Sequence, residues 1–280
     1  MSFISHTPSP PLSFYINSFY SPNESLPLPR EKILPLPGLD LKINFGGSFQ
    51  VFDTDQGEPF TTLKESWALG LWTKSHIVDW PEDLQYVAVN FKPSGAYPFL
   101  GLPLSELQNR VVPLDAIWGS LAAELRERLY AAPTIKARFA LLEQFLLARL
   151  RESPPGLKVV QCAVAEIARQ HGIVSIRELS ERIGMSQKHL IVQFKQMVGG
   201  TPKELGRLYR FGDILASISP TQPVDWTLIA HQFYFHDQSH FIRDFREFSG
   251  HTPSDYLRLL HQLYAEKPDR TQYLRLLPIG

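Results

Sequence analysis

Two short stretches of the chain place basic, amide and hydroxyl side chains at helical spacing, opposite a row of apolar residues. Successive residues of an α-helix are rotated by about 100°, so each apolar row leaves an outward face. On such a face an arginine fork can bond guanine O6 and N7, whereas a lysine can neutralise a phosphate. The outward and flanking residues are Gln187, Lys188, Ile191, Val192 and Lys195 in the first stretch, and Gln238, Ser239, Ile242, Arg243 and Arg246 in the second.

These stretches belong to two copies of one longer pattern. Asp237 follows Ser186 by 51 positions, and every matched position keeps this offset. The first copy is Ser186, Leu190, Phe194, Lys195, Gly199, Thr201 and Pro202, and the second is Asp237, Phe241, Phe245, Arg246, Gly250, Thr252 and Pro253. A plain helical bundle is the alternative explanation, because leucines and phenylalanines at this spacing form a core in either case.

The capping residues predict the elements that position the first outward face. Ser175 can cap one helix and Ser186 can cap the next, with the tight turn Gly184-Met185 between them. Gly199-Gly200 ends the second helix, because glycine readily adopts the left-handed conformation found after helices. The result is a helix-turn-helix unit, in which one helix supports the other.

The second copy predicts the same arrangement. Asp225 and Asp237 can cap its two helices, and Phe241, Phe245 and Phe248 form the inward row of the latter. Its turn, residues 234–236, is one residue longer than the first. A single helix from Thr201 to about Ser219 should connect the two units.

Residues 175–260 resemble the DNA-binding domain of the AraC/XylS family of bacterial transcription regulators. The resemblance is carried by residues 235–241 (Phe-His-Asp-Gln-Ser-His-Phe), Arg243, Phe245-Arg246 and residues 250–253 (Gly-His-Thr-Pro), over about a third of the chain. It implies a transcription regulator that binds double-stranded promoter DNA through both units. Two such units can enter successive major-groove turns, roughly 34 Å apart, on one face of the duplex.

The resemblance also suggests roles for the outward residues. Arg243 is the best candidate for reading a base, and Gln238 and Ser239 can donate or accept hydrogen bonds. Lys195 and Arg246 are expected to neutralise phosphates, which positions a protein without specifying sequence. For Lys188 or Lys195 taken alone, a solvated surface role is about as good an explanation.

The chain departs from the family pattern at two places. Val192 stands where family members often have arginine, beside the apolar Ile191, so the two could contact thymine methyls or this unit could read less sequence. Tyr234 stands where the turn usually has glycine. A tyrosine at positive φ is costly, so we expect the longer turn to take another path.

Composition agrees with a DNA partner for the C-terminal half. The 280 residues suggest two domains, with 28 Lys and Arg against 28 Asp and Glu. Residues 1–154 hold 13 basic and 16 acidic residues, whereas residues 155–280 hold 15 and 12. The lone Cys162 excludes an intramolecular disulfide, and its apolar surroundings predict a core position. No run approaches the 18 apolar residues of a membrane span and no secretory signal is visible, so we expect no membrane association and a cytoplasmic protein.

The fold class expected for the whole chain is α+β, with a β-rich N-terminal domain followed by an all-α double helix-turn-helix domain. Short strands at 39–45, 48–52, 65–73, 76–78 and 85–91 suggest a small, cupin-like barrel or a sandwich whose interior is lined by Val87, Val89 and Phe91. Two antiparallel helices, 115–131 and 134–150, should follow. The predicted divisions are a proline-rich irregular arm (1–30), a sensor domain with the helical pair (31–150), a linker (151–156), the DNA-binding domain (157–262) and a partly disordered tail (263–280).

By the same resemblance, the N-terminal domain senses an effector and the helical pair mediates dimerisation. A small-molecule effector, RNA polymerase and a homodimer formed through residues 115–150 are the expected partners besides DNA. Its aromatic residues either fill the barrel or line a pocket; these are Phe45, Phe49, Phe52, Trp67, Trp72, Trp80 and Tyr86. The ligand itself is not implied.

Catalytic chemistry is not expected. The N-terminal half offers His6 and His76 but no cysteine, too few ligands for a catalytic metal site. We expect His76 to hydrogen-bond at a strand end, and we expect no cofactor. Two alternatives stay open, namely an enzyme-like or metal-binding sensor joined to the DNA-binding domain, and a protein-interaction module without a small effector.

Overall fold

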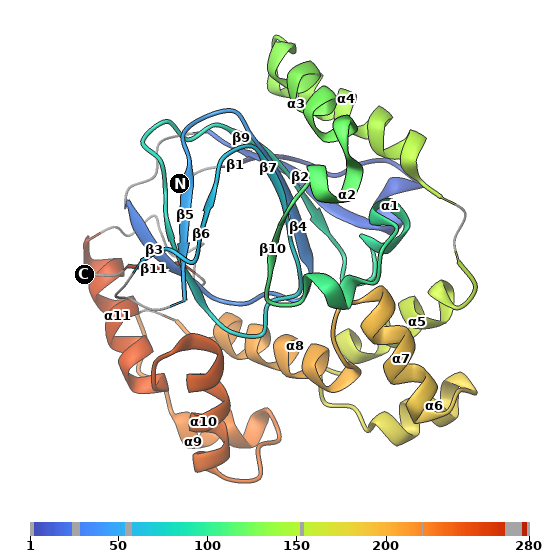
Figure 1. The fold of residues 1–280 in the computed structure, drawn as a ribbon. Coiled ribbons are helices and arrows are strands. Elements are labelled where there is room, and N and C mark those ends of the chain that lie inside the picture. Colours follow the sequence, from blue (N-terminus) through green and yellow to red (C-terminus); the bar gives the residue numbers. More distant parts are fainter. Residues whose placement is uncertain are drawn as a thin grey trace.

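The structure, a computed structural model, describes residues 3–23, 29–53, 58–151, 154–219, 221–266 and 276–278. A β-rich N-terminal domain with two sheets carries a pair of helices on one side, and a helical C-terminal domain lies against its other end (Figure 1). Among the described residues, no helix is long and apolar enough to cross a membrane. The β-rich N-terminal domain and the helical C-terminal domain confirm the predicted α+β fold class.

All recorded strand pairs of the two sheets are antiparallel. The first sheet has the order β1 (Phe3–His6), β2 (Ile16–Pro22), β9 (Tyr86–Phe91), β4 (Leu39–Asn44), β7 (Ser66–Leu69) and β10 (Val111–Pro113). The second has the order β11 (Leu276–Pro278), β3 (Arg30–Ile33), β8 (His76–Asp79), β5 (Phe49–Phe52) and β6 (Thr61–Leu63).

The prediction that Val87, Val89 and Phe91 of strand β9 line the interior between the sheets is wrong, because they lie on the opposite face of the strand. Val87, Val89 and Phe91 are fully buried, but their cluster also contains Phe139 and Leu142 of the helical pair. The residues between the sheets include Tyr86 and Ala88 instead, with Phe49 and Trp67. Alternation predicts two faces but not which one meets a helix, because both faces of this sheet are covered.

The predicted irregular arm contains strands β1 and β2, and β2 lies inside the first sheet between β1 and β9. Its prolines misled the prediction, since Pro8, Pro10 and Pro11 occupy the connection between the strands while Ile16 and Phe19 are buried. The tail likewise contributes β11, which pairs with β3. Residues 267–275 of the tail and residues 152–153 of the linker lie outside the described part of the chain.

The helical pair is present as α3 (Ser120–Ala131) and α4 (Ile135–Arg149), after the short α1 (Tyr97–Leu100) and α2 (Asp115–Trp118). Leu125 and Leu129 are buried as expected for the apolar stripe of α3, whereas Leu121 from the same predicted stripe is exposed.

The C-terminal helices follow the predicted caps closely. They are α5 (Leu157–Arg169), α6 (Ile176–Ile183), α7 (Gln187–Met197), α8 (Pro202–Ser217), α9 (Trp226–Gln232), α10 (Gln238–Ser249) and α11 (Pro253–Glu266). Cys162 is exposed on α5, which corrects the expected core position. Val160, Ala163 and Ile167 form the buried stripe, and Cys162 lies off it.

The two domains share a hydrophobic core. Leu34 and Leu71 of the β-rich domain belong to the same buried cluster as Leu208 and Phe211 of α8. Near the first unit, Gln196 Nε2 of α7 donates to Tyr97 Oη of α1 over 2.7 Å. The helix α8 thus connects the two helix-turn-helix units beneath the β-rich domain (Figure 1).

Candidate nucleic-acid interface and N-terminal cavities

The first helix-turn-helix unit is built by its caps and one glycine. Ser175 Oγ accepts the Glu178 N–H and Ser186 Oγ accepts the His189 N–H, which fixes the starts of α6 and α7. Between them, Gly184 has a φ of +72°. The Met185 N–H donates to the Ser180 carbonyl oxygen over 3.0 Å, which closes the end of α6.

The second unit repeats this geometry with a tyrosine in the turn. Tyr234 has a φ of +56°, and the Phe235 N–H donates to the Ala230 carbonyl oxygen over 2.9 Å. Tyr234 therefore takes the place of Gly184, and the expectation that the longer turn avoids positive φ is wrong. The tyrosine side chain is 74% exposed, so its cost is local backbone strain rather than a packing clash.

The outward and inward faces of α7 and α10 lie where the periodicity predicts. Of the ten outward or flanking residues, only Ile191 and Ile242 are half-buried, and the other eight are exposed. The inward rows are buried, and they consist of Leu190, Phe194 and Met197 on α7 and of Phe241, Phe245 and Phe248 on α10. Ile242 packs against the C-terminal core, so it supports α10 from the edge of its outward face.

The cations of these faces form no ion pair with a described carboxylate, but Arg243 lies near Glu247, whose pKa is lowered by the hydrogen bond from Arg207 and, in the same direction, by the charge of Arg243. Within the described ranges, Lys188 and Lys195 on α7 and Arg243 and Arg246 on α10 form no ion pair. Their charges are therefore available to an anionic partner.

A further arginine, which the sequence analysis missed, fixes α10 against α8. Arg207 donates from Nε and Nη2 to the Asp244 carboxylate, over 3.2 and 3.1 Å, and from Nη2 to Glu247 Oε2 over 2.6 Å. Its guanidinium also lies 4.8 Å from the centre of the Phe248 ring. The only signal in the sequence was an acidic pair three residues apart on the predicted helix.

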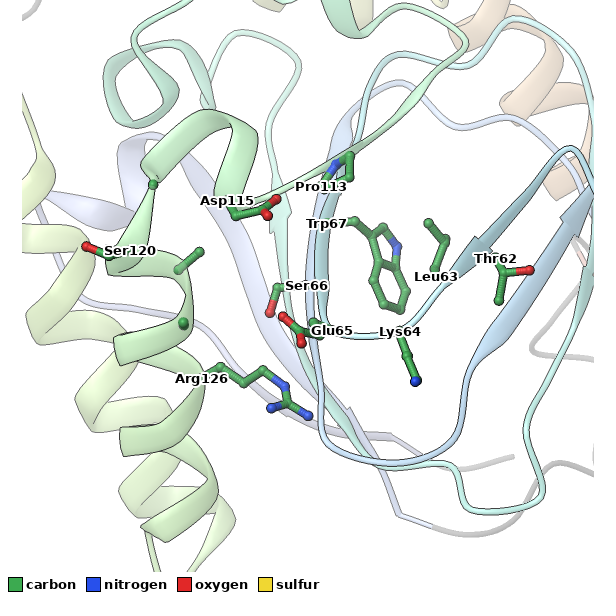
Figure 2. Close-up of a pocket in the computed structure, with 13 residues that line it drawn as sticks. Thr62, Leu63, Lys64, Glu65, Ser66, Trp67, Pro113, Asp115, Ser120 and Arg126 are labelled. Carbon is green, nitrogen blue, oxygen red and sulfur yellow. The ribbon is translucent and has the colours of Figure 1, made fainter.

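Figure 2 shows a cavity of about 360 Å³ between the β6–β7 segment and α3. Glu65, Ser66 and Trp67 line it from one side, and Ser120 and Arg126 from the other. Arg126 is already engaged, because its Nε donates to the Asn44 carbonyl oxygen over 2.8 Å. The exposed Lys64 and Glu65 place charges of both signs in this groove.

A second cavity, of about 90 Å³, lies between the two sheets and is lined by Lys42, Trp72 and His76. The expected hydrogen bond of His76 is not found, since its buried Nδ1 has no partner within the described residues. Burial lowers the pKa of His76 to about 3, with the charge of Lys42 acting in the same direction. The imidazole is therefore neutral near pH 7.

The aromatic residues of this domain divide between the two expected uses. Phe49, Trp67 and Tyr86 fill the space between the sheets, with Trp80 against them. Trp72 instead lines the smaller cavity, where its ring lies 4.2 Å from that of His76. In the described part of the chain, no group of three His, Cys, Asp or Glu residues is placed to hold a metal ion.

Two family models match parts of the chain. Residues 179–259 match the model described as "Helix-turn-helix domain", and residues 4–113 match "Domain of unknown function (DUF6597)". A search of curated proteins found no match.

Among solved structures, the chain is similar to ToxT from Vibrio cholerae O395 at 14% identity and a TM-score of 0.42, over 92% of this chain and 98% of that one. It is also similar to unsaturated fatty acid-bound ToxT from V. cholerae strain SCE256, at 13% identity and a TM-score of 0.41, over 92% of this chain and 95% of that one. The similarity to the AraC-like transcriptional activator CuxR has 16% identity and a TM-score of 0.24, over 71% of this chain and 73% of that one.

The doubled caps, the two outward basic faces and the family match lie on the same residues. Together they show that residues 179–259 form a helix-turn-helix domain, the DNA-binding part of a transcription regulator.

Proposed function

We propose that α7 and α10 are the recognition helices and that they enter successive major grooves on one face of promoter DNA, roughly 34 Å apart. The observation that carries this proposal is that both outward faces hold exposed cations that form no ion pair with a described residue, over buried apolar rows.

The outward residues divide by chemistry into base readers and phosphate contacts. Arg243 reads a guanine through its fork, and Gln238 and Ser239 bond base edges or nearby phosphates. Lys188, Lys195 and Arg246 neutralise phosphates. On α7, Gln187 lies at the first helical position, and the apolar Ile191 and Val192 suit thymine methyls; Val192 is 54% exposed.

The rest of the chain would regulate this binding without a catalytic step. An effector in the N-terminal domain would bias the C-terminal half through the shared core around Leu34 and Leu71. Leu121, Tyr130 and Leu147 are exposed on the helical pair, which supports a homodimer through residues 115–150. As an activator in the cytoplasm, the protein would also contact RNA polymerase.

Genome-wide mapping of bound sites, followed by footprinting of the purified protein on the recovered fragments, tests the proposal. We expect protection of two major-groove segments about one helical turn apart on the same face. Lys188→Ala and Arg246→Ala should weaken binding, while Lys136→Ala, an exposed cation on α4, should not. Absence of protection at low salt on every fragment would sink the proposal.

A further inference from the structure

The smaller N-terminal cavity is lined by hydrogen-bond donors that no described residue satisfies. It lies beneath the β3–β4 connection, between strand β4 of one sheet and strand β8 of the other. Its volume of about 90 Å³ is well below that of a drug-sized pocket. Only a molecule of a few heavy atoms would fit there.

Lys42 is the central donor. Its side chain is 7% exposed, and its Nζ lies 5.0 Å from the Tyr86 ring centre and 5.3 Å from that of Trp80. Over the described ranges, no carboxylate forms an ion pair with it. An ammonium group buried in this way is costly unless an acceptor neutralises it.

Two further groups face the same cavity. The buried Trp72 Nε1 and His76 Nδ1 both have no hydrogen-bond partner among the described residues. Lysine and tryptophan can only donate, and a neutral histidine can donate from one nitrogen. The occupant that satisfies them must therefore offer acceptors.

Asp40, the carboxylate that lines the cavity, is committed elsewhere. The two oxygens of Asp40 accept from Tyr20 Oη and from Asn90 Nδ2, each over 2.7 Å. Glu31 on β3 is also buried, but it does not line the cavity. Burial lowers the pKa of Lys42, and the charge of Asp40 opposes that shift.

We infer that this cavity binds a small organic carboxylate, whose oxygens accept hydrogen bonds from Lys42, Trp72 and His76. The inference rests on the proposed function, because it names the chemical class of the effector. The short apolar remainder of the acid lies against Leu34, Leu36 and Leu69.

The cavity adjoins the shared core, which gives the ligand a route to the DNA-binding domain. Leu34 lines the cavity and also packs in the cluster that contains Leu208 and Phe211 of α8. Leu71 in that cluster lies between the cavity residues Gly70 and Trp72. Filling the cavity therefore acts on residues that hold α8 in place.

Titration calorimetry on the full-length protein tests the inference, with acetate, propionate and butyrate as probes and their uncharged amides as matched controls. Chloride at equal ionic strength controls for general anion effects. We expect saturable binding of at least one carboxylate and none of its amide. Trp72→Phe keeps the ring but removes one donor, so it should weaken binding about tenfold or more.

Lys42→Met should abolish binding, and it should leave the protein folded because an apolar side chain of similar length replaces a buried charge. Lys64→Met is the matched control, since Lys64 is an exposed lysine that lines the larger groove. Loss of binding in Lys64→Met but not in Lys42→Met would place the ligand in that groove and overturn the inference.

Equal binding of the amides or chloride, or no binding of any probe, would also overturn it. DNA binding measured without ligand on the same preparations keeps the two ideas separate. A protein that protects its promoter sites but binds no carboxylate contradicts only the effector chemistry.

Discussion

Arg207 and Arg243 lie on neighbouring helices of the second unit but differ in what surrounds their guanidinium groups. Arg207 is held by Asp244 and Glu247 and lies over Phe248, whereas Arg243 is exposed and forms no ion pair with any described residue. The first arginine therefore stabilises the unit, and the second is the one that we propose to contact DNA.

Arg243→Ala should cost about 1–3 kcal/mol of binding free energy on a specific site and relax preference at one base position. The reason is that a bidentate contact to guanine discriminates among bases. Competition binding against sites with single base substitutions measures this loss of binding free energy and of base preference. Lys195→Ala is the comparison, since loss of a phosphate contact should weaken all sequences alike and reduce the salt slope by about one unit. A uniform loss for Arg243→Ala would refute base reading.

Tyr234→Gly should stabilise the protein by roughly 0.5–1 kcal/mol. The substitution removes left-handed strain of about 1–2 kcal/mol, partly offset by the greater freedom of glycine in the unfolded chain. Gly184→Ala makes the reverse change in the first unit, where an added Cβ would meet no atom within 4 Å. Urea denaturation should show the two substitutions shifting stability in opposite directions; a destabilised Tyr234→Gly protein would argue against strain.

At the scale of elements, the contact between α8 and α10 sets the orientation of the second recognition helix. Asp244 is 13% exposed at its side chain, so it depends on Arg207 for neutralisation. The hydrogen bond from Arg207 also lowers the pKa of Glu247. The contribution of Glu247 to the free energy of unfolding is therefore fully present above the unfolded pKa of glutamate, and it is lost as the pH falls through the lower pKa of the folded state.

Arg207→Leu should destabilise the C-terminal domain by about 1–3 kcal/mol, because it leaves the partly buried Asp244 without its cation. It should also weaken specific DNA binding, although Arg207 is not assigned a DNA contact. Arg258→Ala removes an exposed ion pair with Asp255 and should cost under about 1 kcal/mol. Thermal unfolding compares the two variants. Equal effects would show that the interaction of Arg207 with Asp244 and Glu247 is no stronger than a surface ion pair.

The sequence predicted most elements of the C-terminal domain because their signals are local. Ser175, Ser186, Asp225 and Asp237 cap helices through hydrogen bonds that span two or three residues. Arg207 could not be found in this way, since its partners lie 37 and 40 residues further along the chain.

The N-terminal domain was harder because its strands are short and its sheets are covered on both faces. Alternation in β9 gave two sets of residues, but only the packing of the helical pair decides which set faces it. The donors around Lys42 come from β4, β8 and the segment after β7, so no spacing in the sequence brings them together.

For the whole molecule, both helix-turn-helix units are attached to the β-rich domain. The segment Leu104–Leu107 packs near the end of α7, where an added Cβ on Gly199 would lie 3.0 Å from the Leu104 carbonyl oxygen. In the other unit, Lys32 Nζ lies 3.3 Å from His251 Nε2. The relative position of α7 and α10 therefore depends on the fold of the N-terminal domain.

This shared attachment predicts that the two domains unfold together. Leu71→Ala leaves a cavity in the shared core and should cost about 2–5 kcal/mol, so that unfolding separates into two transitions. Differential scanning calorimetry measures the number of transitions. Leu63→Ala creates a similar cavity between the two sheets, away from α8, and should lower the melting temperature while a single transition remains. Two transitions in the unaltered protein would mean that the domains are energetically independent and that an effector must act on DNA binding by another route. A single transition in Leu71→Ala would mean that the coupling between the domains does not depend on the shared core around Leu71.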